Sequence, residues 1–248
     1  MIKSIKTNLI TKMPVFFYET TDSTNLRARE YLKVGKKTPA LFIANGQSAG
    51  RGRLGKSFYS PKDTGIYMTY AFSPEIALDS AVSVTTVASV AVMRAIERVC
   101  GKKTMIKWVN DLYLDGKKVC GILAEAVTDG AVLKHIIIGV GINLTTAVFP
   151  DDIKDTAGSI GSNDKARLIG EIANEFANAD FFNLDRYIDE YKSRSMVLLK
   201  EITYIENGKC IDAVAVDIDS AGGLVVRHCD GSLKTLRSGE ISIKMRQT

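Results

Sequence analysis

Residues 46 to 55, GQSAGRGRLG, combine four glycines with two arginines, Arg51 and Arg53, that are separated by one residue. Glycine lets backbone N–H groups approach a ligand closely, because it has no side chain to hold the ligand away. Arginine supplies a fixed positive charge and paired donors that fit a phosphate or a carboxylate. The stretch therefore predicts an anion-binding loop, and a solvated basic surface loop is the alternative.

The same loop matches the letters of the nucleotide-binding P-loop pattern GxxxxGK[ST], with GRGRLGKS at positions 50 to 57. A P-loop stands between a strand and a helix. The residues that follow here, FYSPKDTG, include two aromatic residues, Pro61 and a glycine, and they cannot continue a helix. No predicted strand ends in an aspartate of the Walker-B kind. We therefore exclude a P-loop NTPase.

A second group of polar residues lies in KWVNDLYLDGKK, at positions 107 to 118. Two lysines on one hairpin would be ordinary surface, but asparagine and aspartate are disfavoured within a strand. Their presence in this segment therefore indicates a site. The candidate residues are Lys107, Asn110, Asp111 and Lys118.

The segment GVGIN, at positions 139 to 143, ends a fully apolar run with Gly139, Gly141 and Asn143. Small residues let a flat group approach the backbone, and the Asn143 carboxamide can read the edge of a heterocycle. A bulge or tight packing against a neighbouring element is the alternative explanation for the two glycines.

These polar groups must be positioned by several strands. Runs of branched and aromatic residues predict strands at 15–19, 40–45, 66–72, 105–114, 117–127 and 133–144. The last three form a meander whose turns are Asp115-Gly116 and Asp129-Gly130, because aspartate followed by glycine favours a tight hairpin turn.

Apolar residues at helical spacing predict helices at 22–35, 79–100, 164–182 and 184–199. Asp22 or Ser23 is expected to cap the first helix. The second helix is expected to be the central core helix, because it is rich in small and branched apolar residues. Residues 147–163 lack a regular period and predict a mobile loop.

The character of the chain changes at residue 200, where short strands alternate with glycine-containing turns. The turns are Asn207-Gly208, Ala221-Gly222-Gly223 and Asp230-Gly231. Short strands joined by tight turns predict a small antiparallel barrel. We therefore expect two domains, residues 1–199 and residues 200–248, with the boundary near Leu199.

The composition narrows the class of protein. The 33 Lys and Arg exceed the 28 Asp and Glu by a net charge of +5, which fits an anionic small molecule or an acidic protein better than nucleic acid. Four cysteines without a CxxC pair, and only two histidines, predict free thiols in a reducing cytoplasm rather than a zinc site. No signal-peptide pattern is found, and the longest apolar-rich run, 81–93, is shorter than the ~20 residues of a membrane helix. We expect a soluble cytoplasmic protein without membrane partners.

Four motifs, in this order, resemble the biotin protein ligase family: DSTN, GQSAGRGRLGKSFYSP, KWVNDLYLDGKKVCGILAE and IIIGVGINL. The resemblance is dense from about residue 18 to residue 143, and looser at the C-terminal GEISIK. It implies an α+β fold, with a mixed-sheet catalytic domain and a small C-terminal SH3-like β-barrel. It further implies an enzyme that uses ATP and Mg²⁺ to convert biotin to biotinyl-5′-AMP. The biotinyl group then passes to a lysine of the biotin carboxyl carrier protein domain of a carboxylase.

The resemblance assigns biotin-binding residues by matching motifs. Hydroxyl and amide side chains suit biotin's ureido ring, which offers one carbonyl acceptor and two N–H donors. The biotin-binding residues implied are Ser23, Thr24, Asn25, Gln47, Gly50, Arg51, Gly52, Arg53, Lys118, Gly121 and Leu123.

The resemblance also assigns the nucleotide site and the catalytic groups. Residues expected to bind ATP or the adenylate are Arg51, Arg53, Lys107, Asn110 and Asn143, with Asn143 meeting adenine. Attack of a carboxylate on a phosphate brings like charges together, so the catalytic set consists of charge-stabilising groups: Arg51, Arg53, Lys118 and Asp111. Asp111 is either a Mg²⁺ ligand or the acceptor of the carrier lysine's proton.

Three residues depart from the family's common motifs. Val109 stands where proline is frequent, Phe58 where tryptophan is frequent, and Leu54 where a basic residue is frequent. Only about 17 residues precede the catalytic strand, too few for the winged-helix domain of ligase–repressors, so we expect no operator binding.

Two other functions have to be weighed. A lipoate or octanoate ligase or transferase of the same superfamily shows a different glycine-rich signature. A non-catalytic biotin-binding relative would not need the phosphate-binding charge. An exposed sheet edge could support a homodimer or docking of the carrier domain. Residues 147–163 are expected to become protected from protease when biotin and ATP bind.

Overall fold

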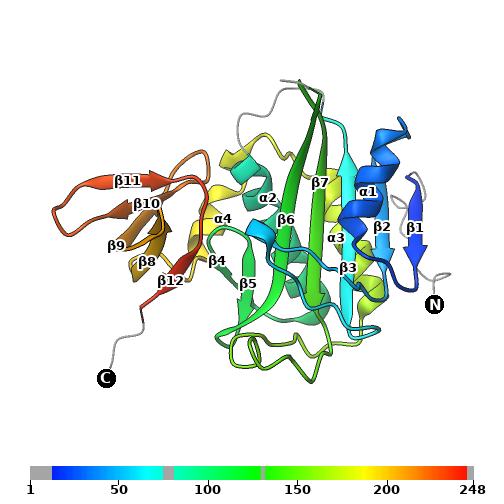
Figure 1. Ribbon diagram of the computed structural model, residues 1–248, viewed down its shortest axis with the longest axis horizontal. Helices are drawn as coiled ribbons and strands as arrows, with labels where there is room; N and C mark the ends of the chain where they lie inside the picture. The colour runs from blue at the N-terminus through cyan, green and yellow to red at the C-terminus, as the bar shows by residue number, and fades with distance from the viewer. Residues whose placement is uncertain (1–12, 75–80, 130–131, 245–248) are drawn as a thin grey trace.

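The computed structural model describes residues 13–74, 81–129 and 132–244. Two sheets lie side by side, one seven-stranded and one five-stranded (Figure 1). The expected α+β class is confirmed, with a mixed sheet in the larger part and a separate antiparallel five-stranded sheet at the C-terminal end. Within the described ranges, no helix is long and apolar enough to cross a membrane.

The seven-stranded sheet has the order β1-β2-β3-β7-β6-β5-β4, and only the β1–β2 pair is parallel. Its strands are β1 (Val15–Tyr18), β2 (Ala40–Ala44), β3 (Gly65–Phe72), β4 (Met105–Lys107), β5 (Asp111–Leu114), β6 (Lys117–Asp129) and β7 (Val132–Asn143). Gly121 of β6 lies opposite Gly141 of β7, and Leu123 opposite Gly139. Because alternate residues share a face, this register gathers three glycines at the middle of one face.

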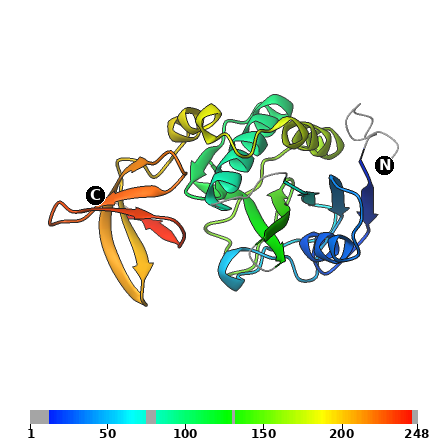
Figure 2. The same ribbon diagram turned by 90° about the horizontal axis from the view of Figure 1, so that it is seen from above.

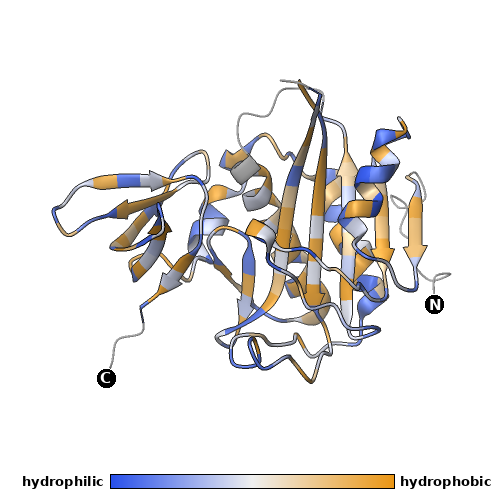
Figure 3. Ribbon diagram, viewed as in Figure 1, coloured by the Kyte–Doolittle hydropathy of each residue, from blue (hydrophilic) through white to orange (hydrophobic). Residues whose placement is uncertain are grey.

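Helices cover both faces of this sheet (Figure 2). Helix α1 (Thr24–Lys33) packs on one face, and α2 (Ala81–Cys100) and α3 (Lys165–Asn178) pack on the other. Hydrophobic colouring runs along the central strands and the helices against them (Figure 3). The central-helix prediction is confirmed, since the apolar side chains of α2 from Val84 to Ile96 are buried. Positions 79 and 80 of the predicted helix lie outside the described residues.

The predicted strand 105–114 was wrong, because the chain turns after Lys107 and forms two short strands, β4 and β5. Trp108 and Val109 are both buried in the turn, and the peptide bond between them is cis. Their polar groups bond elements outside the strand pair. The Tyr191 hydroxyl donates to the Val109 carbonyl at 3.0 Å, and Trp108 Nε1 donates to the Gly222 carbonyl at 3.0 Å. Asn110 therefore lies in a turn rather than in a strand.

The predicted helix 184–199 is also shorter than expected. It consists of a 3₁₀ turn, η4 (Leu184–Arg186), and the short helix α4 (Ile188–Ser193). Beyond α4 the backbone pairs with β4: Ile106 N donates to Arg194 O at 2.7 Å, and Met196 N to Ile106 O at 2.9 Å. These bonds draw the chain out of the helix.

The C-terminal sheet is antiparallel, in the order β11-β10-β9-β8-β12. Its strands are β8 (Glu201–Glu206), β9 (Lys209–Ile218), β10 (Leu224–Arg227), β11 (Leu233–Leu236) and β12 (Ile241–Ile243). The predicted glycine turns are found, with positive φ at Gly208, Gly222 and Gly231. The Asp115-Gly116 turn is also found, whereas Gly130 lies outside the described residues. The boundary near Leu199 stays a prediction.

Residues 147–163 form no helix or strand, as expected. The segment nevertheless bonds to the start of β6, because Lys118 N donates to Thr156 O at 2.8 Å and Gly158 N to Lys118 O at 2.9 Å. It therefore lies beside the candidate residue Lys118. Its mobility stays a prediction.

Candidate active site

A cavity of about 300 Å³ is lined by residues from the start of α1 and the seven-stranded sheet at one end and by residues 239–242 at the other. It collects residues from the start of α1, the glycine-rich loop, the β4–β5 turn, β6, β7 and the segment 239–242. Of the residues assigned from the sequence, it brings together Ser23, Thr24, Asn25, Gln47, Arg51, Gly52, Arg53, Lys107, Asn110, Asp111, Lys118, Gly121 and Leu123. Gly50 and Asn143 do not line it.

The end of the cavity beside α1 is neutral and buried. Ser23, Thr24 and Asn25 are between 2% and 4% exposed, so their polar groups depend on protein partners. Thr69 of β3 lies beneath them, with its hydroxyl 2.8 Å from Thr24 Oγ1 and 2.7 Å from Asn25 Oδ1. A buried polar network with all members bonded holds each group in one orientation. This end can present fixed donors and acceptors to a neutral polar ring.

Gln47 joins the glycine-rich loop to this network. Its Oε1 accepts from Thr24 N at 2.9 Å and from Thr24 Oγ1 at 3.2 Å, and its Nε2 donates to Ser60 Oγ at 3.0 Å. Thr24 N is one of the otherwise unpaired donors at the start of α1. Ser23 is the N-cap residue, but its side chain makes no capping bond. The acceptor for Thr24 N is therefore Gln47, which the sequence could not show because it lies 23 residues away, while Asp22 Oδ1 accepts from Ser23 N at 2.6 Å.

The glycines of the loop serve different purposes. A Cβ atom on Gly50 would lie 2.4 Å from Phe58 O and 2.5 Å from Ser60 Oγ, so this position requires glycine for packing within the loop. At the tip, Leu54 and Gly55 have φ of 53° and 77°, and the chain folds back so that Gly52 N donates to Lys56 O at 2.7 Å. The loop's compact folding explains these glycines without a ligand.

Arg53 connects the loop to both sheets. Its Nη1 donates to Asn110 Oδ1 at 3.2 Å and its Nη2 donates to Gly239 O at 3.2 Å. Burial lowers the pKa of the Arg53 guanidinium, which nevertheless stays charged at neutral pH. Asn110 is held in turn by its Nδ2, which donates to Ile122 O at 2.9 Å. Next to this link, Lys56 Nζ pairs with Glu240 Oε2 at 2.7 Å.

Two lysines and an aspartate complete the charged end. Lys118 Nζ lies 2.8 Å from Asp111 Oδ1, so the two side chains form an ion pair. The angles of this contact are not those of a hydrogen bond. Burial lowers the pKa of Lys107, although nearby Asp111 acts in the opposite direction. Burial disfavours the charged form of a lysine, so an anion that binds beside Lys107 would stabilise its positive charge.

The flat group that lies over the glycines of β6 and β7 is a side chain of this protein. A Cβ atom on Gly141 would lie 2.5 Å from Phe58 Cε1, and one on Gly121 would lie 3.2 Å from Phe58 Cε2. Tight packing, the alternative stated for Gly141, therefore explains it. Gly139 has a similar neighbour, because a Cβ there would lie 2.2 Å from Asn25 Oδ1.

Asn143 lies at the end of β7, outside the cavity lining. It is 4% exposed, and its Nδ2 donates to Gly158 O at 3.0 Å. Its buried Oδ1 has no hydrogen-bond partner among the described residues. Contact with adenine therefore stays a prediction for this residue, and it would involve the segment around residue 158.

Sequence reasoning missed several groups at the site. Thr69 and Glu125 bond the α1 end, and residues 239–242 line the cavity. Glu125 shares its face of β6 with Gly121 and Leu123, so the two-residue period of a strand could have found it. Thr69 could have been noticed as a polar residue in an apolar strand.

A metal ion would find few protein ligands here. Among the described residues, no group of three or more His, Cys, Asp or Glu side chains could hold a metal. Mg²⁺ in nucleotide sites is commonly held by one or two carboxylates together with the phosphates of the substrate. Asp111 is a carboxylate at the cavity that could take that role, and its Oδ1 is already ion-paired with Lys118 Nζ at 2.8 Å.

Comparisons with known proteins agree with this arrangement. The family described as "Biotin/lipoate A/B protein ligase family" matches residues 17–143, and "Biotin protein ligase C terminal domain" matches residues 200–244. The "Bifunctional ligase/repressor BirA" of Bacillus subtilis is 35% identical over 59% of this chain and 46% of its own length. The chain thus matches less than half of that relative.

One shorter relative and one solved structure extend the comparison. The "Biotin--[acetyl-CoA-carboxylase] ligase" of Paracoccus denitrificans is 33% identical over 66% of both chains. The biotin protein ligase of Aquifex aeolicus, solved with biotin and ATP, superposes with a TM-score of 0.77 at 23% identity. That superposition covers 93% of this chain and 98% of the Aquifex chain. At this identity the likeness shows the fold.

Proposed function

The chain belongs to the biotin/lipoate A/B protein ligase family, and we propose that it joins biotin to a lysine of a carboxylase's biotin-carrying domain. The reaction proceeds through biotinyl-5′-AMP and consumes ATP. The name of the Paracoccus denitrificans relative supports the choice of carboxylase as acceptor.

One observation carries the proposal: a buried neutral network and a cluster of cations line the same cavity. Biotin has a neutral ureido ring at one end and a carboxylate at the other. The ring fits the network of Thr24, Asn25 and Gln47, which offers both donors and acceptors. The carboxylate would then extend toward Arg51 and Arg53, where the ATP phosphates also gather.

In the first half-reaction, a biotin carboxylate oxygen attacks the α-phosphorus of ATP, and the bond to the departing pyrophosphate breaks. The reactants are both anionic, so the required catalysis is positioning and charge stabilisation. Arg51 bridges the carboxylate and the α-phosphate, Arg53 neutralises phosphate charge, and Lys118 contacts both partners of the new bond. No nucleophilic side chain is needed.

In the second half-reaction, the neutral amine of the carrier lysine attacks the biotinyl carbonyl, and AMP leaves. In the first half-reaction, bound Mg²⁺ would neutralise charge on the ATP phosphates. Asp111 would hold that ion or, in the second half-reaction, accept the lysine proton. Lys107, Asn110 and Asn143 are proposed to contact the nucleotide, with Asn143 facing adenine.

The lipoate alternative is less well supported. A lipoyl group has no ureido ring to use the donors and acceptors of Thr24, Asn25 and Gln47. The match of residues 200–244 to the C-terminal domain of biotin protein ligases also favours biotin. We further propose a cytoplasmic protein with no nucleic-acid or membrane partner, and a homodimer as a possible assembly.

A transfer assay tests the proposal. The protein is incubated with ATP, Mg²⁺, a carrier domain and either labelled biotin or labelled lipoate. Biotin transfer that requires ATP, and fails with a carrier whose acceptor lysine is changed to arginine, is the expected result. Transfer from lipoate alone would indicate the other branch of the family. Tight biotin binding without ATP turnover would indicate a binding protein.

A further inference from the structure

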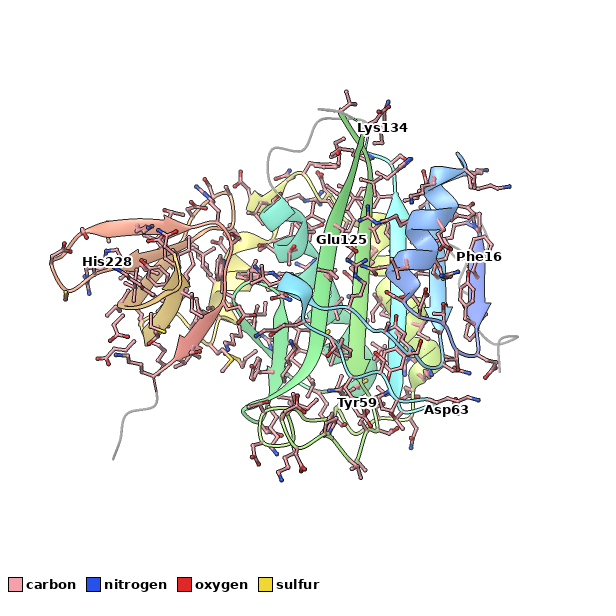
Figure 4. The ribbon with its side chains drawn as sticks, viewed as in Figure 1. Phe16, Tyr59, Asp63, Glu125, Lys134 and His228 are labelled. Carbon is pink, nitrogen blue, oxygen red and sulfur yellow. The ribbon has the colours of Figure 1, made fainter. Side chains whose placement is uncertain are left out.

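Glu125 is a charged side chain that does not line the cavity but contacts two residues that do, Asn25 and Arg51, and the proposed reaction does not use it. It lies in the middle of β6, on the face that carries Gly121 and Leu123 (Figure 4). Its side chain is 16% exposed. A carboxylate buried to this extent is retained as an ion only when partners compensate its charge.

The two oxygens of Glu125 have different partners. Asn25 Nδ2 donates to Oε2 at 2.7 Å, so one oxygen holds a member of the neutral network. Arg29 Nη2 donates to Oε1 at 3.2 Å, and Arg51 Nη2 lies 3.7 Å from the same Oε1. Glu125 therefore connects the neutral end of the cavity with the glycine-rich loop.

The contact with Arg51 is an ion pair rather than a hydrogen bond, because 3.7 Å exceeds hydrogen-bond distance. Among the described residues, the Arg51 guanidinium makes no hydrogen bond, and its side chain is 43% exposed. A long arginine side chain on a loop would otherwise sample many rotamers. The carboxylate thus restrains where the guanidinium lies and leaves its donors available.

We propose that Glu125 is a positioning residue that directs Arg51 toward the carboxylate of biotin. The inference rests on the proposed function for the identity of the ligand. Arg29 shares the carboxylate, so the hold on Arg51 is weak enough for the guanidinium to turn toward an incoming anion. Glu125 then remains compensated by Arg29 and Asn25.

The first test is the substitution Glu125→Gln. Glutamine keeps the size of the side chain and an oxygen that can accept from Asn25 Nδ2, but removes the charge that attracts Arg51. Binding is measured by calorimetry for biotin and for biotinol, its neutral alcohol analogue. Because only biotin offers Arg51 an anion, we expect biotin affinity to fall by about tenfold and biotinol affinity to change by less than about twofold.

Arg29→Gln is the matched control. It removes the other cation from the same carboxylate, so it perturbs Glu125 equally but leaves the Arg51 contact. Biotin affinity should stay within about twofold of the parent. In an Arg51→Ala background, Glu125→Gln should cause no further loss, because the residue through which it acts is gone. Should Glu125→Gln fail to fold, Glu125→Asp replaces it. The shorter aspartate places its carboxylate farther from Arg51, so the variant should still weaken the binding of biotin more than that of biotinol.

Several outcomes would overturn the proposal. Equal losses for biotin and biotinol would mean that Glu125 only shapes the pocket through Asn25. Tighter biotin binding in Glu125→Gln would mean that Glu125 competes with the substrate for Arg51. If Arg29→Gln reduced biotin affinity as much as Glu125→Gln, the loss would come from disturbing the Arg29, Arg51 and Glu125 charges in general and not from the Arg51 contact.

A readout without substrate separates this inference from the proposed function. Phenylglyoxal modification of the ligand-free protein, followed by mass spectrometry, reports the reactivity of each arginine. Arg51 should react faster in Glu125→Gln than in the parent, while the exposed Arg227 of β10 should not change. Unchanged Arg51 reactivity would refute the ion pair. A parent protein that binds neither biotin nor biotinol would instead refute the proposed function.

Discussion

The two ends of the cavity hold their polar groups in different ways. At the α1 end, hydrogen bonds link Thr24 to Gln47 and Asn25 to Thr69, and Asn25 also donates to the Glu125 carboxylate. Thr24 and Asn25 are almost fully buried. At the other end, Lys56 and Arg53 reach across to residues 239 and 240, beside the C-terminal sheet. The residues of the first end all come from the part of the chain that contains the seven-stranded sheet. The second end also includes residues next to the C-terminal sheet.

This difference has consequences for binding. Short hydrogen bonds in a buried network are little affected by salt and fix geometry before a ligand arrives. Ion pairs between half-exposed side chains are weak, screened by salt and readily exchanged. A neutral ring would therefore meet a preformed surface, while an anion would replace ion pairs that the protein makes with itself. The predictions below test that contrast.

The largest effect is expected from Arg51→Ala. The variant removes the cation proposed to bridge the reacting carboxylate and phosphate, so adenylate formation should slow by about 100-fold or more. Pyrophosphate release from biotin and ATP measures this step. Arg227→Ala, an exposed change on β10, serves as the control and should have no effect. If Arg51→Ala formed adenylate at the parent rate, the loop's assignment would be wrong.

The next effect is expected from Gln47→Leu at the neutral end. Leucine removes the acceptor for Thr24 N, so the protein should lose about 1 kcal/mol of unfolding free energy, as for other lost helix caps. Biotin affinity should fall by about tenfold, and the loss should be the same at low and high salt. Denaturant unfolding and calorimetry measure the two quantities. Ser48→Ala, one residue along the loop, should leave both unchanged.

Residues named from the sequence line both ends of the cavity, but the residues that support them were not named. Motif order placed Thr24, Asn25 and Gln47 together, and the fold brings them to one cavity because α1 and β2 adjoin the same face. Their supports, Thr69 and Glu125, lie 44 and 100 residues from Asn25 along the chain. Such contacts follow from sheet register, which local patterns do not specify.

The charged end shows a second limit of prediction from the sequence. The strand predicted at 105–114 breaks at Trp108 because buried partners from α4 and the C-terminal sheet take its polar groups. Local alternation cannot reveal partners that distant. Likewise, the glycines of GVGIN suggested space for a ligand, but Phe58 occupies the surface above Gly141. Gly141 is therefore required by the packing of a side chain from another loop, which the local pattern could not show.

A smaller effect on ATP binding is expected when the pH of the solution is raised, because a lysine at the charged end loses its proton. Burial lowers the pKa of Lys107, so this residue loses its proton at a lower pH than an ordinary lysine. As pH rises through that pKa, the cavity loses a positive charge, and KM for ATP should increase by about threefold. Lys107→Arg keeps its charge at high pH and should abolish the increase. An equal increase in Lys107→Arg would assign the titration to another group.

The smallest effect is expected from Lys56→Ala, which breaks the ion pair between the loop and Glu240. The two side chains are 65% and 37% exposed, and exposed pairs contribute about 0 to 1 kcal/mol. KM for ATP should therefore change by about twofold at low salt and should not change at high salt. Glu240→Gln should reproduce the effect, and the double variant should add nothing to either single change. A salt-independent loss would mean that the contact between loop and C-terminal sheet is held by the Arg53 hydrogen bonds instead. In that case the charged end would be as preformed as the neutral one, and the contrast between the two ends would not hold.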